Sequence, residues 1–179
     1  MIKKIILICL NILIIIYLAW PLPTLSDLPQ SVKSTEPGDT VQMKNVSAYF
    51  TDLERPDVIS FYVNNYQAKH PLSFKINHPP ERAKQIFVGT IQSYYLEEII
   101  IPFKQSLFIN GFDWQKDVFT KEGKKEANKM LVDDQEYRVK VTLRTFTTQN
   151  LFISYLLILS TQLLIIKSIP VYKKLFKKS

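Results

Sequence analysis

Two long apolar runs lie near the ends of the chain. The first, Ile5 to Ala19, reads IILICLNILIIIYLA and contains no charged residue. Extended to Leu22 as a helix, it would be roughly 27 Å long, close to the ~30 Å hydrocarbon layer of a bilayer. The pattern predicts a transmembrane helix at residues 5–22.

A cleaved secretory signal peptide is the alternative for this run, because two lysines followed by an apolar core are also typical of a signal sequence. However, the residues Leu18-Ala19-Trp20-Pro21 lack the small side chains that a cleavage site requires. An uncleaved anchor is therefore the preferred interpretation.

The second run, Leu151 to Ile166, reads LFISYLLILSTQLLII, and Ile169 extends its apolar surface. As a helix it would be roughly 28 Å long. It lacks the charged face that keeps an amphipathic helix on the membrane surface. A second transmembrane helix is therefore predicted at residues 148–169.

The segment between the runs predicts a tether and a folded domain. Residues 23–38 combine proline with serine and threonine, which indicates a tether or a strap lying on the domain. Residues 39–147 have the length of one domain. Val46 to Phe50 predicts a strand, and a helix with Pro56 in its first turn follows. The apolar face of that helix contains Val58, Ile59, Tyr62 and Tyr66.

A strand through Leu72, Phe74 and Ile76 is predicted next. The motif Asn77-His78-Pro79-Pro80-Glu81 then predicts the start of a second helix, because prolines and an acid suit a first turn. This helix would end at Pro102. Its apolar face would contain Ala83, Ile86, Phe87, Ile91, Tyr94, Tyr95 and Ile99. The pair Asn110-Gly111 predicts a hairpin turn.

The clearest period-two pattern follows a predicted turn at Asp133-Asp134. Tyr137, Val139, Val141 and Leu143 alternate with Arg138, Lys140, Thr142 and Arg144. The patterns together predict an α+β protein, in which two transmembrane helices flank one small extracytoplasmic domain. We expect the domain to have a mostly antiparallel sheet and two main helices on one of its faces.

The positive net charge of the chain comes from residues near its two ends. The chain has 23 Lys and Arg against 16 Asp and Glu, a net charge of +7. Residues 24–147 contain 16 bases and 16 acids, so their net charge is 16 − 16 = 0. The other seven bases are Lys3, Lys4, Lys167, Lys173, Lys174, Lys177 and Lys178. This distribution argues against a nucleic-acid partner, which the total alone would suggest.

Positive charge beside a membrane span is retained in the cytoplasm. Residues 1–4 and the basic tail 170–179 are therefore predicted to be cytoplasmic. Residues 23–150 are predicted to lie outside the cytoplasmic membrane, so the lipid bilayer is the first expected partner.

Two amides interrupt the apolar runs. Asn11 lies seven residues after Lys4, and Gln162 lies five residues before Lys167. In an antiparallel pair the two amides would lie at similar depths, which predicts a hydrogen bond between the spans or between protomers. Ser160 and Thr161 would be small polar neighbours in this contact. The alternative is that each amide is bonded to its own helix or tolerated in lipid.

Candidate binding residues in the domain are few. Arg138, Lys140 and Arg144 form a basic stripe on the strand expected nearest the membrane, where it could contact anionic headgroups. The alternative is a solvated strand face whose bases are paired with nearby acids.

The histidines of the chain form a second candidate, a polar cluster of His70, His78 and Glu81. This cluster lacks a third convincing metal ligand at a characteristic spacing. No nucleophile elbow or glycine-rich phosphate loop is visible either. No catalytic residue, metal or cofactor is therefore predicted.

The stretch from Asn77 to Trp114, with NHPPERAKQI and SYYLEEIIIPFKQSLFINGFDW, and the later VTLRTF, resembles an uncharacterised family of small predicted membrane proteins from uncultivated small-genome bacteria. The resemblance implies a bacterial cell-envelope setting. It supplies no activity and no site residue.

These observations predict a membrane-anchored, non-enzymatic interaction or structural module of the cell envelope, which binds a protein partner or its own copies. An envelope enzyme or small-ligand receptor that uses the His70, His78 and Glu81 cluster or the Asn110–Trp114 turn is one alternative. An accessory subunit of a transport or secretion complex is another.

Overall fold

The chain divides into two compact units in a computed structural model that describes residues 2–36, 44–86, 94–117 and 120–176. Residues 22–147 form one unit, which we call the sheet unit. Residues 1–21 and 148–179 form the other, which we call the helical unit. The two units are described separately below.

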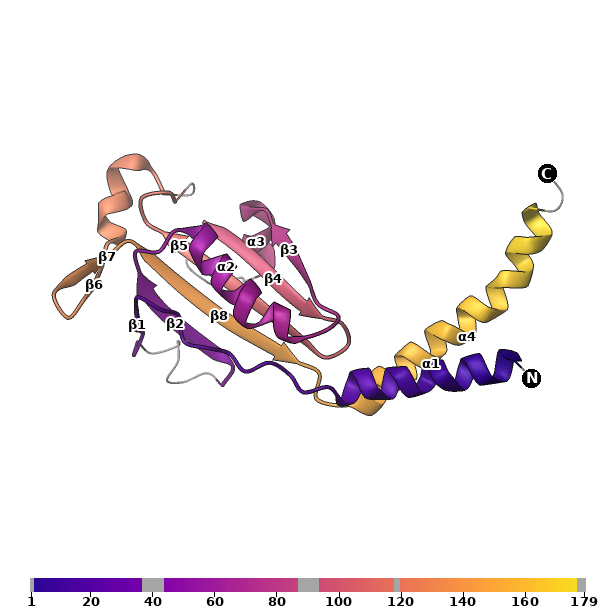
Figure 1. Cartoon of the computed structure of the whole chain (residues 1–179). Coiled ribbons are helices and arrows are strands. Elements are labelled where there is room, and N and C mark those ends of the chain that lie inside the picture. The colour runs from indigo at the N-terminus through magenta and orange to yellow at the C-terminus, as the bar shows by residue number, and fades with distance from the viewer. Residues whose placement is uncertain (1, 37–43, 87–93, 118–119, 177–179) are drawn as a thin grey trace. The chain divides into compact units, whose positions relative to one another are not determined.

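A six-stranded, fully antiparallel sheet forms the sheet unit, with the strand order β1-β2-β8-β5-β4-β3 (Figure 1). Its strands are β1 (Ser31–Lys33), β2 (Val46–Thr51), β3 (Phe74–His78), β4 (Tyr95–Ile101), β5 (Gln105–Asp113) and β8 (Val139–Thr147). A separate hairpin pairs β6 (Met130–Val132) with β7 (Gln135–Tyr137). The helices of the unit are α2 (Arg55–Asn65), η1 (Gln67–Lys69), α3 (Pro80–Ile86) and η2 (Glu122–Asn128). The predicted α+β class with a mostly antiparallel sheet is confirmed.

Strand β8 confirms the period-two prediction. Val139, Val141 and Leu143 are buried, and the residues between them are half-buried. Asp133 and Asp134, in the turn that precedes β7, both have positive φ angles, of 51° and 62°. Two such residues form the type of turn that matches the twist of a short hairpin.

Helix α2 covers one face of the sheet (Figure 1). Its predicted apolar face is confirmed, because Val58, Ile59 and Tyr62 are buried and Tyr66 follows at the C-cap. These side chains join one core cluster with residues from four strands. The strand residues of the cluster are Tyr49, Tyr95, Ile99, Ile101, Leu107, Ile109, Val139, Val141 and Leu143.

Helix α3 packs on the opposite face, so the expectation that both main helices share one face was wrong. Ala83 of α3 contacts Leu96 and Phe108. Leu96 lies next to Tyr95, which belongs to the other cluster, and neighbouring residues of a strand point to opposite faces. The physical reason is that β4 is buried on both faces and therefore needs cover on each.

The predicted long helix from Pro80 to Pro102 was also wrong. Helix α3 ends at Ile86, and β4 begins at Tyr95. Phe87 and Ile91, assigned to the face of this helix, lie outside the described residues. The run YLEEIII is rich in aromatic and β-branched residues, which favour a strand, and Pro102 lies in the β4–β5 turn.

The predicted hairpin turn at Asn110-Gly111 was wrong as well, because both residues lie inside β5. Gly111 is opposite Tyr95 on β4. A Cβ atom at position 111 would lie 2.0 Å from Cε1 of the Tyr95 ring. The glycine therefore makes room for an aromatic ring across the strands.

Strand β3 forms where a strand was predicted, but its alternate apolar residues are not in the core. Phe74 and Ile76 are 46% and 37% exposed, and Leu72 before the strand is 59% exposed. The reason is topological. Strand β3 is an edge of the sheet, so these side chains have neighbours on one side of the strand but not on the other.

The proline-containing segment after the first apolar run packs on the sheet unit. Leu28 is buried in the α2 cluster, and Leu22 and Leu25 pack against that cluster. Strand β1, at residues 31–33, pairs with β2. Tyr49 donates a hydrogen bond of 2.5 Å to Asp27, which ties the segment to the sheet.

The helical unit contains α1 (Ile2–Ala19) and α4 (Leu151–Phe176). Asn150 caps α4 by accepting hydrogen bonds from the backbone of Phe152 and Ile153. Within the described residues, the segment Leu151–Ser168 is long and apolar enough to cross a membrane, with a mean hydropathy of 1.8. The apolar part of α1, Ile6–Ala19, is shorter than an 18-residue span.

Replacement of Gly111 by alanine should destabilise the sheet unit by about 1–3 kcal/mol, because the added methyl group overlaps the Tyr95 ring. Denaturant unfolding of the full chain in a mild detergent, followed by tryptophan fluorescence, measures this loss. The matched control is Gly123→Ala, where an added Cβ would meet nothing within 4 Å. In a Tyr95→Leu background the Gly111→Ala cost should shrink, and an equal cost in both backgrounds would contradict this explanation.

Candidate functional site

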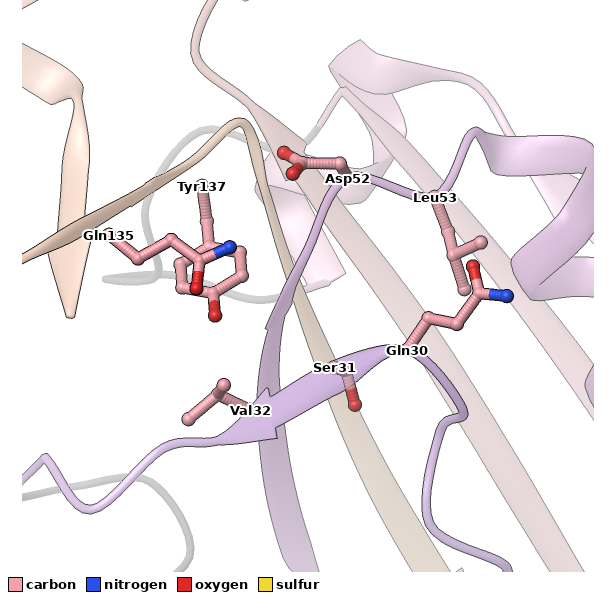
Figure 2. A pocket seen from close by; sticks show the side chains of 7 residues that line it. All are labelled: Gln30, Ser31, Val32, Asp52, Leu53, Gln135 and Tyr137. Carbon is pink, nitrogen blue, oxygen red and sulfur yellow. The ribbon is translucent and has the colours of Figure 1, made fainter. Parts of the chain in front are cut away.

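A hollow of about 380 Å³ lies at the end of the sheet unit where β8 begins. It is lined by Gln30, Ser31, Val32, Asp52, Leu53, Gln135 and Tyr137. Figure 2 shows Gln135 and Tyr137 on one side of the hollow and Leu53 and Gln30 on the other. Its volume lies in the range of small-molecule sites.

Polar side chains make up most of the lining of the hollow. Its lining offers two amides, a hydroxyl, a phenol and the carboxylate of Asp52, and no basic residue lines it. Asp52 already accepts a hydrogen bond of 2.9 Å from the Arg138 backbone. The Ser31 hydroxyl donates a hydrogen bond of 2.6 Å to the Leu28 carbonyl, and no histidine or cysteine lines the hollow.

A network of four charged side chains lies beside Asp52. Arg138 pairs with Glu54 at 2.7 Å and with Asp113 at 3.5 Å, and Lys116 pairs with Glu54 at 2.7 Å. The hydrogen bonds from Lys116 and Arg138 lower the pKa of Glu54. The network joins the start of α2 to the end of β5 and the start of β8.

A second charged group lies under α2. Glu97 on β4 is 1% exposed and pairs with Arg55 of α2 and, at 3.5 Å, with Lys75 of β3. The Arg55 guanidinium lies over the Tyr95 ring, 5.3 Å from its centroid. A buried carboxylate is costly unless it is paired, so Arg55 is the residue that makes Glu97 tolerable there.

The predicted cluster of His70, His78 and Glu81 is not brought together by any described contact. His70 follows η1, and its Nδ1 accepts a hydrogen bond from the Leu72 backbone. Burial lowers the pKa of His70, and the nearby Lys104 adds to the shift. His78, at the other end of β3, pairs with Glu98 at 2.9 Å. Among the described residues, no group of three or more His, Cys, Asp or Glu could hold a metal ion.

The predicted basic stripe is largely paired with acids. Arg138 belongs to the network described above, and Lys140 pairs with Glu36 at 2.9 Å and lies over the Phe50 ring. Arg138 and Lys140 lie where β8 begins, whereas Arg144 lies near Thr147, where β8 ends and the chain continues to α4. The three bases are therefore spread along β8, from just before its first residue to near its last.

In the helical unit, Asn11 joins the two helices, but its partner is Tyr155. The Tyr155 hydroxyl donates a hydrogen bond of 3.1 Å to Oδ1 of Asn11, and Nδ2 of Asn11 donates to the Leu7 carbonyl at 2.8 Å. The Oε1 atom of Gln162 is buried and has no hydrogen-bond partner within the described part of the chain. The contact thus lies two helical turns from the predicted one.

The two small polar neighbours of Gln162 bond their own helix. Ser160 and Thr161 both donate to the Leu157 carbonyl, each at 2.8 Å. Nothing in these two bonds crosses between α1 and α4. Both hydroxyls are therefore satisfied within α4.

The open edge of the sheet is a feature that the sequence pattern missed. Strand β3 pairs with β4 on one side, and no described residue pairs with its other side. The alternation of Leu72, Phe74 and Ile76 predicted a strand but carried no signal of an edge position. Edge position depends on which strands pair, which is a long-range property.

The chain has no match among known protein families, curated proteins or solved structures. Its function must therefore be inferred from its own geometry.

Replacement of Arg55 by methionine should destabilise the sheet unit by on the order of 3 kcal/mol, because it leaves the buried Glu97 carboxylate with Lys75, at 3.5 Å, as its one cation among the described ion pairs. Unfolding in detergent, as for Gly111, measures the loss. The control is Lys33→Met, which breaks the exposed pair with Asp27 and should cost under about 1 kcal/mol. The double variant Arg55→Met with Glu97→Met should recover stability, and failure to recover it would argue against an isolated charge as the cause.

Proposed function

We propose that this protein is a membrane-anchored interaction module, without enzymatic activity, whose sheet unit binds a protein partner or a second copy of the chain by addition of a strand to β3. The observation that carries the proposal is the open edge of β3 with two exposed apolar side chains. The resemblance to a family of small bacterial membrane proteins favours a cell-envelope setting.

Membrane anchoring is supported by the surfaces of α1 and α4. Large apolar side chains are exposed along both helices, among them Ile6, Leu13 and Leu164 at 60%, 61% and 68%. Soluble proteins rarely expose contiguous apolar surfaces of this extent. We infer that α4 spans the bilayer and that α1, with the apolar residues after it, forms the second span.

The orientation follows from the lysines. Lys3 and Lys4 precede the first apolar run, and Lys167 and the tail follow the second. Under the positive-inside rule both chain ends lie in the cytoplasm and the sheet unit lies outside.

Strand addition at β3 is favoured by its chemistry. Proteins usually protect sheet edges by short strands, prolines or charges. Strand β1, the other edge, has three residues, whereas β3 has five and contains no proline. Its single charge, Lys75, is directed to the buried Glu97. A partner strand would gain backbone hydrogen bonds, and Phe74 and Ile76 would supply apolar contacts on alternate positions.

The proposed orientation can be tested with single cysteines in a Cys9→Ser background. In intact spheroplasts a membrane-impermeant maleimide should label the cysteine of a Glu122→Cys variant. The same maleimide should label the cysteine of a Lys174→Cys variant only after permeabilisation, because the tail would be cytoplasmic. Labelling at position 174 in intact spheroplasts would contradict two spans with both ends inside.

The edge can be tested by a photoactivatable residue in place of Asn77, which lies on β3. Irradiated native membranes should yield one discrete adduct, either with a partner or with a differently tagged copy. Ile76→Lys should reduce the adduct at least about tenfold, because it replaces one apolar contact by a charge.

The matched control for the edge is Leu131→Lys, which changes a side chain that is 71% exposed on β6, outside the six-stranded sheet. It should leave the adduct unchanged. If Ile76→Lys and Leu131→Lys have equal effects, or if no adduct forms, β3 is not the docking strand.

A further inference from the structure

We propose that the end of the sheet unit from which β8 continues towards α4 contacts the surface of an anionic lipid bilayer. We call it the exit end and define it as residues 44–47, 66–75, 99–107 and 144–147. The inference rests on the membrane anchoring proposed above, but not on the docking role of β3.

Register and contacts bring these four segments together. Val46 pairs with Arg144, Leu107 with Thr145, and Phe74 with Ile100. The Tyr66 hydroxyl donates a hydrogen bond to the Gln105 side chain, which ties the end of α2 to the same place. The exit end is therefore one surface, although its segments are far apart in the sequence.

The length of the chain holds this surface close to the membrane. Thr147 ends β8 and Leu151 begins α4. The four steps between them span at most about 14 Å. Gln105 lies beside Thr147 in the sheet, so the β4–β5 turn at Pro102–Lys104 is about one strand spacing, ~4.8 Å, further away. If α4 spans a bilayer, the exit end cannot leave its vicinity.

The exit end exposes aromatic and aliphatic side chains to its surroundings. Phe103 is 48% exposed, Phe146 is 52% exposed, and Leu72, two residues before β3, is 59% exposed. Phe103 also has a φ angle of 60°, a backbone conformation that is strained for a bulky residue. A strained backbone that exposes an apolar ring is typical of a contact site, and phenylalanine and leucine side chains can enter the headgroup boundary of a bilayer.

The charge of the exit end complements an anionic surface. Its four segments contain Lys44, Lys69, Lys75, Lys104 and Arg144 and no acid; of these bases, Lys104 is buried and Lys75 pairs with Glu97. Lys44 and Lys69 are exposed. Bases near an anionic bilayer surface are attracted to it, and their attraction adds to that of the apolar side chains.

The opposite end of the sheet unit has the reverse character. The segments 52–57, 113–117 and 120–138 contain ten acids and seven bases. The acids are Asp52, Glu54, Asp57, Asp113, Asp117, Glu122, Glu126, Asp133, Asp134 and Glu136. The unit is close to neutral as a whole but polarised from end to end, so an anionic bilayer would attract the exit end and repel the other.

The contact can be tested on the full chain in nanodiscs that contain anionic and zwitterionic lipids and a lipid with a nitroxide at shallow depth. In a Cys9→Ser background, one variant carries a fluorophore on the cysteine of Ser106→Cys, in the exit end. A second variant carries it on the cysteine of Leu131→Cys, at the far end. We expect strong quenching at 106 and little at 131.

Two substitutions test the chemistry. Phe103→Ser should lower the quenching at 106 in all discs. Lys69→Gln should weaken the contact about fivefold in anionic discs only, the loss expected for one base near a charged surface. The matched control is Lys121→Gln, an exposed base at the far end, which should have no effect.

Equal quenching at 106 and 131, or quenching at 106 that Phe103→Ser leaves unchanged, would overturn the contact. A chain that does not enter the discs would instead refute the anchoring, and with it this inference. Tryptophan fluorescence of each variant checks that the sheet unit remains folded.

Discussion

The pairing of β8 with β2 on one side and β5 on the other is the constraint on which the rest of the sheet unit depends. Because side chains alternate strictly along a strand, a slip of one residue would exchange its buried and half-buried faces. Val141 and Leu143 therefore select the register, and the register decides which residues of β5 and β2 face α2. The register of β8 therefore decides which side chains form the core under α2 and which lie on the opposite face of the sheet.

The same strand also connects the folded unit to the apolar helices. It begins directly after Arg138 and its charged network, and its last residue pairs with Gln105, which follows the β4–β5 turn. The charged network and the β4–β5 turn therefore lie at opposite ends of β8, which is nine residues long. Acids gather where the strand begins, and bases with exposed aromatic rings gather where it ends. The sheet unit has no net charge, but its two ends differ in charge and in exposed apolar surface.

Local patterns were misleading wherever burial on two faces removed the periodicity. The run Tyr95–Ile101 is apolar at five of its seven positions and lacks a clear period of two, so it fits a helix and a strand equally well. Its place between β3 and β5, with helices on both faces, made it a strand. Asn110-Gly111 is a strong turn signal on its own, yet Gly111 serves to accommodate the Tyr95 ring. In both cases the deciding contact comes from a residue distant in the sequence.

The sequence alone determined what depends on composition and short periods: the two apolar segments, the charge distribution along the chain, the α+β class, the strand β8 and the buried face of α2. These features follow from side-chain hydrophobicity repeated at the spacing of a helix or a strand. Tertiary structure alone decided the edge position of β3, the Arg55–Glu97 pair, the Asn11–Tyr155 bond, the hollow near Tyr137 and the gathering of bases at one end. Each of these joins residues that lie many positions apart, and no local pattern contains the order in which strands pair. The order of the strands depends on the combined free energy of all contacts in the core, and these contacts form only when the chain folds.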